Sequence, residues 1–96
     1  MEERYQNIRS LVLAEAMDLT TGDRNRDYGE PIDNFERIAA GWRVLLGADV
    51  TPHQVALCMA WLKMARLVET PHHEDSYVDA AAYAALAAQL VVEQDD

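Results

Sequence analysis

The length and composition of the chain limit it to one globular domain. It has 96 residues, of which 50% are hydrophobic and 26% are charged, a balance typical of folded domains and unlike that of disordered segments. Its 8 Lys and Arg against 17 Asp and Glu give a formal net charge of −9, which disfavours binding to bulk nucleic acid. No secretion signal and no apolar run of the roughly 18 residues that a membrane span needs is present. We therefore expect a cytoplasmic protein without membrane attachment.

The first two predicted helices are separated by a loop rich in glycine and charged residues. Apolar side chains at helical spacing predict helices over about residues 3–20 and 32–46. Gly22 suits the left-handed conformation that often follows the last turn of a helix. From Gly22 to Pro31 the sequence GDRNRDYGEP fits neither a helix nor a strand pattern, so it predicts a loop.

The second half of the chain predicts two further helices, over about residues 52–69 and 74–93. Thr51 and Pro52 form a good N-cap and first-turn pair for the earlier one. That helix is apolar almost all round, so it needs partners on several sides. The lone cysteine, Cys58, lies in this apolar segment, where a small buried thiol is the ordinary role.

The fold class follows from these segments together. No strand-like alternation occurs, so the sequence predicts an all-α fold of four helices in a single domain, residues 1–96. Four helices this short bury little core alone, and the surplus apolar surface needs a cover. We therefore expect the four-helix bundle to be completed by homo-oligomerisation, as a homodimer or a homotetramer.

Three carboxylates stand on helix faces that are otherwise apolar. Glu15 lies beside the apolar stripe of the first predicted helix, where a charge needs a partner, a proton or access to solvent. Asp75 and Asp79, four residues apart, lie on one side of the last predicted helix and can share one cation. Asp75 is equally explained by the dipole of its helix, so a metal site and a structural role both stay open.

Polar and cationic side chains add candidate ligand contacts. Lys63 and Arg66 interrupt the apolar helix and, together with Arg24, are candidates for phosphate contacts. Equally, these cations can reach solvent or pair with acids. Asn34, at the start of the second predicted helix, can cap that helix or offer its amide to a ligand.

Two stretches resemble a family of small proteins encoded by bacteriophages and prophages. They are GDRNRDYGEPIDNFERIAAGW, residues 22–42, and KMARLVETPHHEDSYVDAAAYAAL, residues 63–86, and they span most of the chain. This family distantly resembles the MazG-like all-α nucleotide pyrophosphohydrolases. That resemblance implies four-helix units that dimerise or tetramerise and hold Mg²⁺ with a helix-borne EExxE motif and a later ExxD motif.

The match to these metal motifs is uneven. Asp75 and Asp79 resemble the later motif with altered spacing. Asp33, Asn34 and Glu36 stand where the earlier motif would need two or three inward carboxylates. On the helical wheel Glu15 is placed to supply the missing carboxylate.

Two hypotheses follow, and the sequence leaves both open. The first is a phage-encoded, MazG-like hydrolase that converts a ribo- or deoxyribonucleoside triphosphate to the monophosphate and pyrophosphate. In it, Glu15, Asp75 and Asp79 bind Mg²⁺ or Mn²⁺, and Lys63 and Arg66 are catalytic. The nucleotide-binding candidates are Arg24, Tyr28, Asn34, Trp42 and Tyr83, although the aromatic side chains are equally typical of a core. The second hypothesis is a non-catalytic phage accessory protein in the host cytoplasm that binds a host protein or sequesters a nucleotide.

Overall fold

The computed structural model describes residues 2–21 and 31–95, with side chains described for 7–21 and 33–93. Within these ranges the chain forms four α-helices and no strand: α1 (Glu2–Thr21), α3 (Pro31–Leu46), α4 (Pro52–Glu69) and α5 (Glu74–Asp95). The predicted all-α class is confirmed. Each observed helix ends within two residues of its predicted limits. Most of the predicted loop, with Arg24 and Tyr28, lies outside the described residues.

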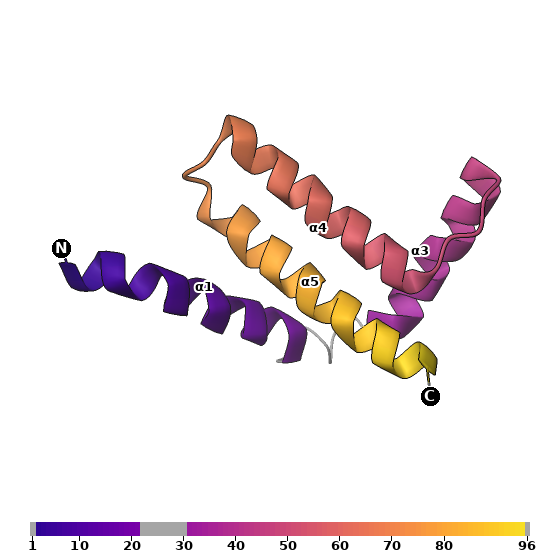
Figure 1. The fold of residues 1–96 in the computed structure, drawn as a ribbon, viewed down its shortest axis with the longest axis horizontal. Coiled ribbons are helices and arrows are strands. Elements are labelled where there is room, and N and C mark those ends of the chain that lie inside the picture. Colours follow the sequence, from indigo (N-terminus) through magenta and orange to yellow (C-terminus); the bar gives the residue numbers. More distant parts are fainter. Residues whose placement is uncertain (1, 22–30, 96) are drawn as a thin grey trace.

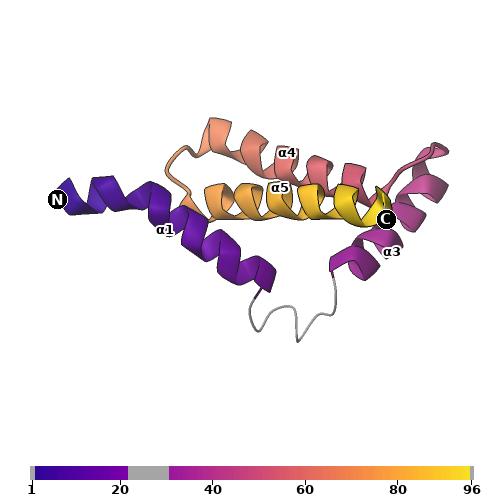
Figure 2. The same ribbon diagram turned by 60° about the horizontal axis from the view of Figure 1, so that its bottom comes forward.

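Three of the helices lie side by side (Figures 1 and 2). α4 and α5 form an antiparallel pair, α1 follows the other side of α5, and α3 crosses the end of the pair near the C-terminus of α5. The molecule measures 50 × 30 × 24 Å along its principal axes. This arrangement is an open layer of helices, so much of the surface of α4 and α1 has no helix packed against it in the described chain.

The start of α4 is defined by local hydrogen bonds. The amide of Gln54 donates to Thr51 Oγ1 at 3.1 Å, and the amide of Thr51 donates to Gln54 Oε1 at 3.0 Å, which makes a reciprocal capping box. Pro52 occupies the first turn, where its missing N–H costs no hydrogen bond. The connection begins at Gly47, whose φ of 64° favours glycine, just after the last turn of α3. The predicted helix start at Thr51 and Pro52 is confirmed.

The main core lies where α3 crosses the α4–α5 pair. Its buried residues are Phe35, Ala39, Val55, Ala56, Ala87 and Leu90. Phe35 and Tyr83 meet edge to face, with ring centroids 6.2 Å apart and planes at 75°, an arrangement that aromatic rings favour. His53 Nδ1 lies 3.0 Å from the carbonyl oxygen of Ala87, so a polar contact also links α4 to α5.

A second, smaller core joins α1 to α5. Ala16, Val78 and Ala82 are buried there, flanked by Val12, Leu19 and Ala81. The alanines at this contact let the two helix backbones approach closely. At the start of α5, Ser76 is 1% exposed, and its Oγ lies 2.8 Å from His73 Nδ1, so the buried hydroxyl has a partner.

In the described part of the chain, no helix is both long enough and apolar enough to cross a membrane. Cys58, which the sequence predicted to be buried, is exposed instead. The reason is that α4 packs through its Val55, Ala56 and Ala60 side, and the side that carries Cys58 faces no other described helix.

Candidate functional site

A pocket lined by four carboxylates lies between α1 and α5. Its volume is about 410 Å³, and we call it the acidic pocket. Its lining comprises Glu15, Asp18 and Leu19 of α1 with Asp75, Val78 and Asp79 of α5. The two contributing segments lie about 60 residues apart in the sequence, and the small core between α1 and α5 brings them together.

The positions of the four carboxylates follow from the 3.6-residue repeat of an α-helix. Ala16 and Val78 are buried between the helices, and their neighbours Glu15 and Asp79 lie at the half-buried edge of that contact. Asp18 and Asp75 follow one turn away and are exposed. The apolar contact therefore holds two carboxylates from each helix at one rim.

An ion pair connects this pocket to α4. Lys63 Nζ lies 3.1 Å from Asp79 Oδ2, and the two side chains are 18% and 32% exposed. A half-buried ammonium group next to a half-buried carboxylate lowers the charge repulsion within the pocket. Lys63, predicted as a phosphate contact or an acid partner, is therefore an acid partner in this structure.

The structure thus brings together four of the residues that the sequence singled out. Glu15, Asp75 and Asp79, the predicted metal ligands, line one pocket, and Lys63 binds Asp79 at its edge. Asp18 is the carboxylate that sequence reasoning missed. Its signal was available, because Asp18 lies three residues after Glu15 and so shares its side of the helix.

Two of the predicted nucleotide-binding aromatics, Trp42 and Tyr83, lie in the main core, and the third, Tyr28, lies outside the described residues. Trp42 and Tyr83 are half-buried and pack against the cluster around Phe35, not in the acidic pocket. Asn34 and Arg66 are exposed side chains on α3 and α4, and neither lines the acidic pocket. That Trp42, Tyr83, Asn34 and Arg66 contact a nucleotide stays a prediction.

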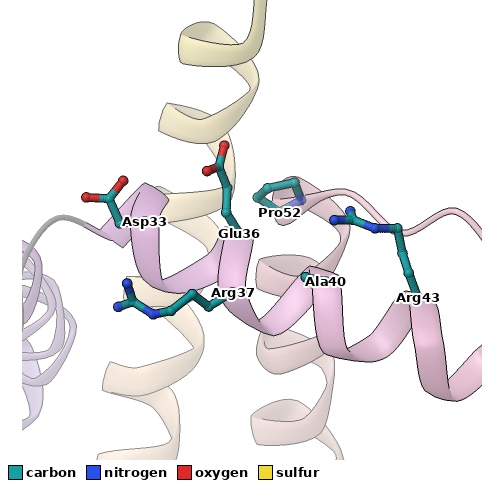
Figure 3. A pocket seen from close by; sticks show the side chains of 6 residues that line it. All are labelled: Asp33, Glu36, Arg37, Ala40, Arg43 and Pro52. Carbon is teal, nitrogen blue, oxygen red and sulfur yellow. The ribbon is translucent and has the colours of Figure 1, made fainter.

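The carboxylates of α3 line a different pocket, shown in Figure 3. This pocket has a volume of about 480 Å³ and is lined by Asp33, Glu36, Arg37, Ala40, Arg43 and Pro52. Arg43 Nη1 donates a hydrogen bond to the carbonyl oxygen of Val50 at 2.7 Å, which ties α3 to the connection before α4. Asp33 and Glu36 are exposed. Asp33, Asn34 and Glu36, which the sequence comparison with MazG-like enzymes singled out, therefore contribute no side chain to the acidic pocket.

Fold and pocket together define a small all-α protein with a carboxylate-lined pocket between two helices. Residues 11–91 match the family model described as a domain of unknown function, DUF6378, and the chain belongs to this family. It is 37% identical over 86 residues to the "Gene 55 protein" of Mycobacterium phage L5, covering 88% of this chain and 55% of that protein. It is 40% identical over 73 residues to the "Gene 55 protein" of Mycobacterium phage D29, covering 76% of this chain and 48% of that protein.

These relatives support the resemblance to small phage-encoded proteins that the sequence motifs indicated. The chain spans about half the length of the curated relatives that it matches. No solved structure matches it.

Proposed function

We propose that this chain is a divalent-metal-dependent nucleotide pyrophosphohydrolase of MazG-like type, with the acidic pocket as its metal site. The substrate is a ribo- or deoxyribonucleoside triphosphate, and the products are the monophosphate and pyrophosphate. One observation carries the proposal: Glu15, Asp75 and Asp79, chosen from the sequence as metal ligands, line a single pocket together with Asp18.

The donor set of the pocket suits Mg²⁺ or Mn²⁺. Both ions prefer oxygen ligands, and the polar groups that line the pocket are carboxylates. Among the described residues, no three His, Cys, Asp or Glu side chains are arranged to enclose one ion. Mg²⁺ does not require such a cage, because it commonly keeps several waters and is held by one or two carboxylates together with substrate phosphates. We therefore propose that the metal enters the pocket with the triphosphate.

The residues of this chain would divide the work as follows. Glu15 and Asp75 would hold the metal, with Asp18 adding negative charge beside it, and the metal when bound would neutralise phosphate charge and lower the pKa of a water molecule. If Lys63 turned toward a phosphate oxygen, its ammonium group would leave Asp79, because it cannot bind both anions at full strength. Asp79 would then be free to bind the metal as well. The exposed guanidinium of Arg66 would add a further phosphate contact from the same helix.

The test is pyrophosphate release by the purified protein with each of the ribo- and deoxyribonucleoside triphosphates, in the presence of Mg²⁺ or Mn²⁺. Asp75→Asn and Glu15→Gln should each lower the rate by about 100-fold or more, because each removes a charge that holds a metal worth several kcal/mol to the transition state. The matched controls are Asp33→Asn and Glu36→Gln, which neutralise the carboxylates of the α3 pocket and should leave the rate unchanged.

Pyrophosphate release, together with calorimetric titration of the metal in the presence of a triphosphate, separates the enzyme from the non-catalytic accessory protein. Pyrophosphate release that depends on Glu15 and Asp75 supports the enzyme. An absence of both release and metal binding would overturn it and favour the alternative, a non-catalytic phage accessory protein. Nucleotide binding that does not depend on a divalent metal would also favour that alternative, because a pocket of carboxylates repels a bare triphosphate.

A further inference from the structure

α4 presents a row of large apolar side chains on the side that no described helix covers. Leu57, Trp61, Met64 and Val68 form this row, which we call the α4 seam. Trp61 is 72% exposed and Val68 is 87% exposed, while Leu57 and Met64 are about half exposed. A single chain would leave these side chains in water, although Val55 and Ala56, on the packed side of α4, are fully buried.

The seam has the spacing of a helix-to-helix contact. Its residues follow one another at intervals of four, three and four, so they match alternating a and d positions of a heptad over two repeats. The positions directly beside the seam carry the small residues Cys58 and Ala65, both exposed. Small flanking side chains let a second helix approach closely, so the occupant that fits this surface is another α-helix.

The charge distribution identifies that helix as α4 of a second copy. The chain carries a net charge of −9, so two copies repel each other over most of their surface. Residues 52–68 contain no Asp or Glu, and the seam itself is uncharged. The α4 seam is therefore a surface on which two acidic copies can meet without placing carboxylates opposite one another.

The exposed area of the seam and its neighbours approaches what such a contact needs. At these exposures the seam side chains present on the order of 100 to 200 Å² each, so the four offer on the order of 500 Å² per copy. A stable interface buries about 800 Å² per partner, and the exposed neighbours Cys58, Leu62 and Ala65 add to the area.

We propose that two copies of this chain associate through their α4 seams, with the two α4 helices antiparallel. In this arrangement Trp61 of each copy packs against Met64 of the other, and Leu57 packs against Val68, so a and d positions meet in every layer. The central layers pair an aromatic ring with a thioether, a favourable contact. This inference does not depend on the proposed hydrolase activity, because none of the seam residues lines the acidic pocket.

The first measurement is the mass in solution by sedimentation equilibrium over a range of protein concentrations. The full chain should reach at least twice its 10.8 kDa mass. Trp61→Glu should raise the dissociation constant by about 30-fold or more, as expected for a central interface residue. Trp61→Leu keeps the seam apolar and should stay associated. Val92→Glu, which charges a 57% exposed valine of α5, is the matched control and should associate like the unmodified chain.

The second measurement tests the direction of the helices by charge pairing. An equimolar mixture of Leu57→Glu and Val68→Lys chains should form heterodimers, because position 57 of one copy faces position 68 of the other in the antiparallel pair. A mixture of Leu57→Glu and Leu57→Lys chains should not, since positions 57 face each other in a parallel pair but lie at opposite ends of the seam in an antiparallel one.

Three results would overturn the proposal. One is a monomeric unmodified chain at all concentrations, and another is a Trp61→Glu variant that associates as strongly as the unmodified chain. The third is heterodimer formation by the second mixture alone. Circular dichroism of each variant distinguishes lost association from lost folding, and because these substitutions lie at exposed positions, we expect helical spectra throughout.

Discussion

The ion pair between Lys63 and Asp79 is the polar link between α4 and the acidic pocket, and its strength can be measured. Lys63→Met leaves a half-buried carboxylate without its cation, and Asp79→Asn leaves the cation without its carboxylate. Because both side chains keep partial contact with solvent, we expect a coupling free energy of about 0.5 to 1 kcal/mol. Urea unfolding of the two single variants and the double variant, at one protein concentration, gives this coupling.

A second cycle provides the control for that value. It combines Lys63→Met with Asp33→Asn, whose carboxylate lines the separate α3 pocket, and its coupling should be near zero. If the first cycle also gives no coupling, the 3.1 Å contact contributes nothing to stability, and the role proposed for Lys63 at the pocket loses its basis.

Individual residues also show which features of the site could be predicted from the sequence alone. The convergence of Glu15, Asp75 and Asp79 could be predicted, because a carboxylate on an apolar helix face needs a partner, a proton or access to solvent, and a shared cation meets that need for all three. The neighbour of Glu15 one turn on, Asp18, was missed because it lies outside the apolar stripe. Trp42 could not be assigned either to core or to ligand from the sequence, since both roles use the same helical spacing.

At the scale of the helices, the capping box of α4 gives the sharpest prediction. Thr51→Ala removes the side-chain oxygen that accepts from the amide of Gln54, so it should lower the free energy of unfolding by about 1 kcal/mol. Thr21→Ala is the matched control. Its hydroxyl donates to the carbonyl oxygen of Met17, one turn back in α1, and its loss should change stability by less than about 0.5 kcal/mol. Equal losses in the two variants would contradict the capping role.

The same helix shows that the spacing of apolar residues does not always predict which side of a helix packs. Spacing and the Thr51–Pro52 pair predicted where α4 begins and ends, because these signals are local. They did not predict which side of α4 packs, since the helix is apolar almost all round. The structure buries the small side chains Val55, Ala56 and Ala60 and exposes Leu57 and Trp61, a choice that depends on the shape of α5 and α3.

At the scale of the molecule, the negative charge of the chain opposes the self-association that its exposed apolar surface favours. One side of α4 has no described helix beside it (Figure 2), the α4 seam is exposed, and burial of that seam favours association. Meanwhile the net charge of −9 on each copy opposes it. Because the seam contains no ion pair that salt could weaken, the electrostatic contribution to association is mainly repulsion between copies.

This balance predicts that salt strengthens self-association. Between about 0.1 M and about 1 M NaCl the Debye length falls from about 10 Å to about 3 Å, so repulsion between the acidic copies is screened while apolar contact is retained. The dissociation constant from sedimentation should therefore fall several-fold over this range. The Trp61→Glu variant, which places a charge in the seam, should stay weaker than the unmodified chain at every salt concentration. A dissociation constant that rises with salt would mean that opposite charges hold the copies together, and the interface would then lie elsewhere than on the uncharged seam of α4.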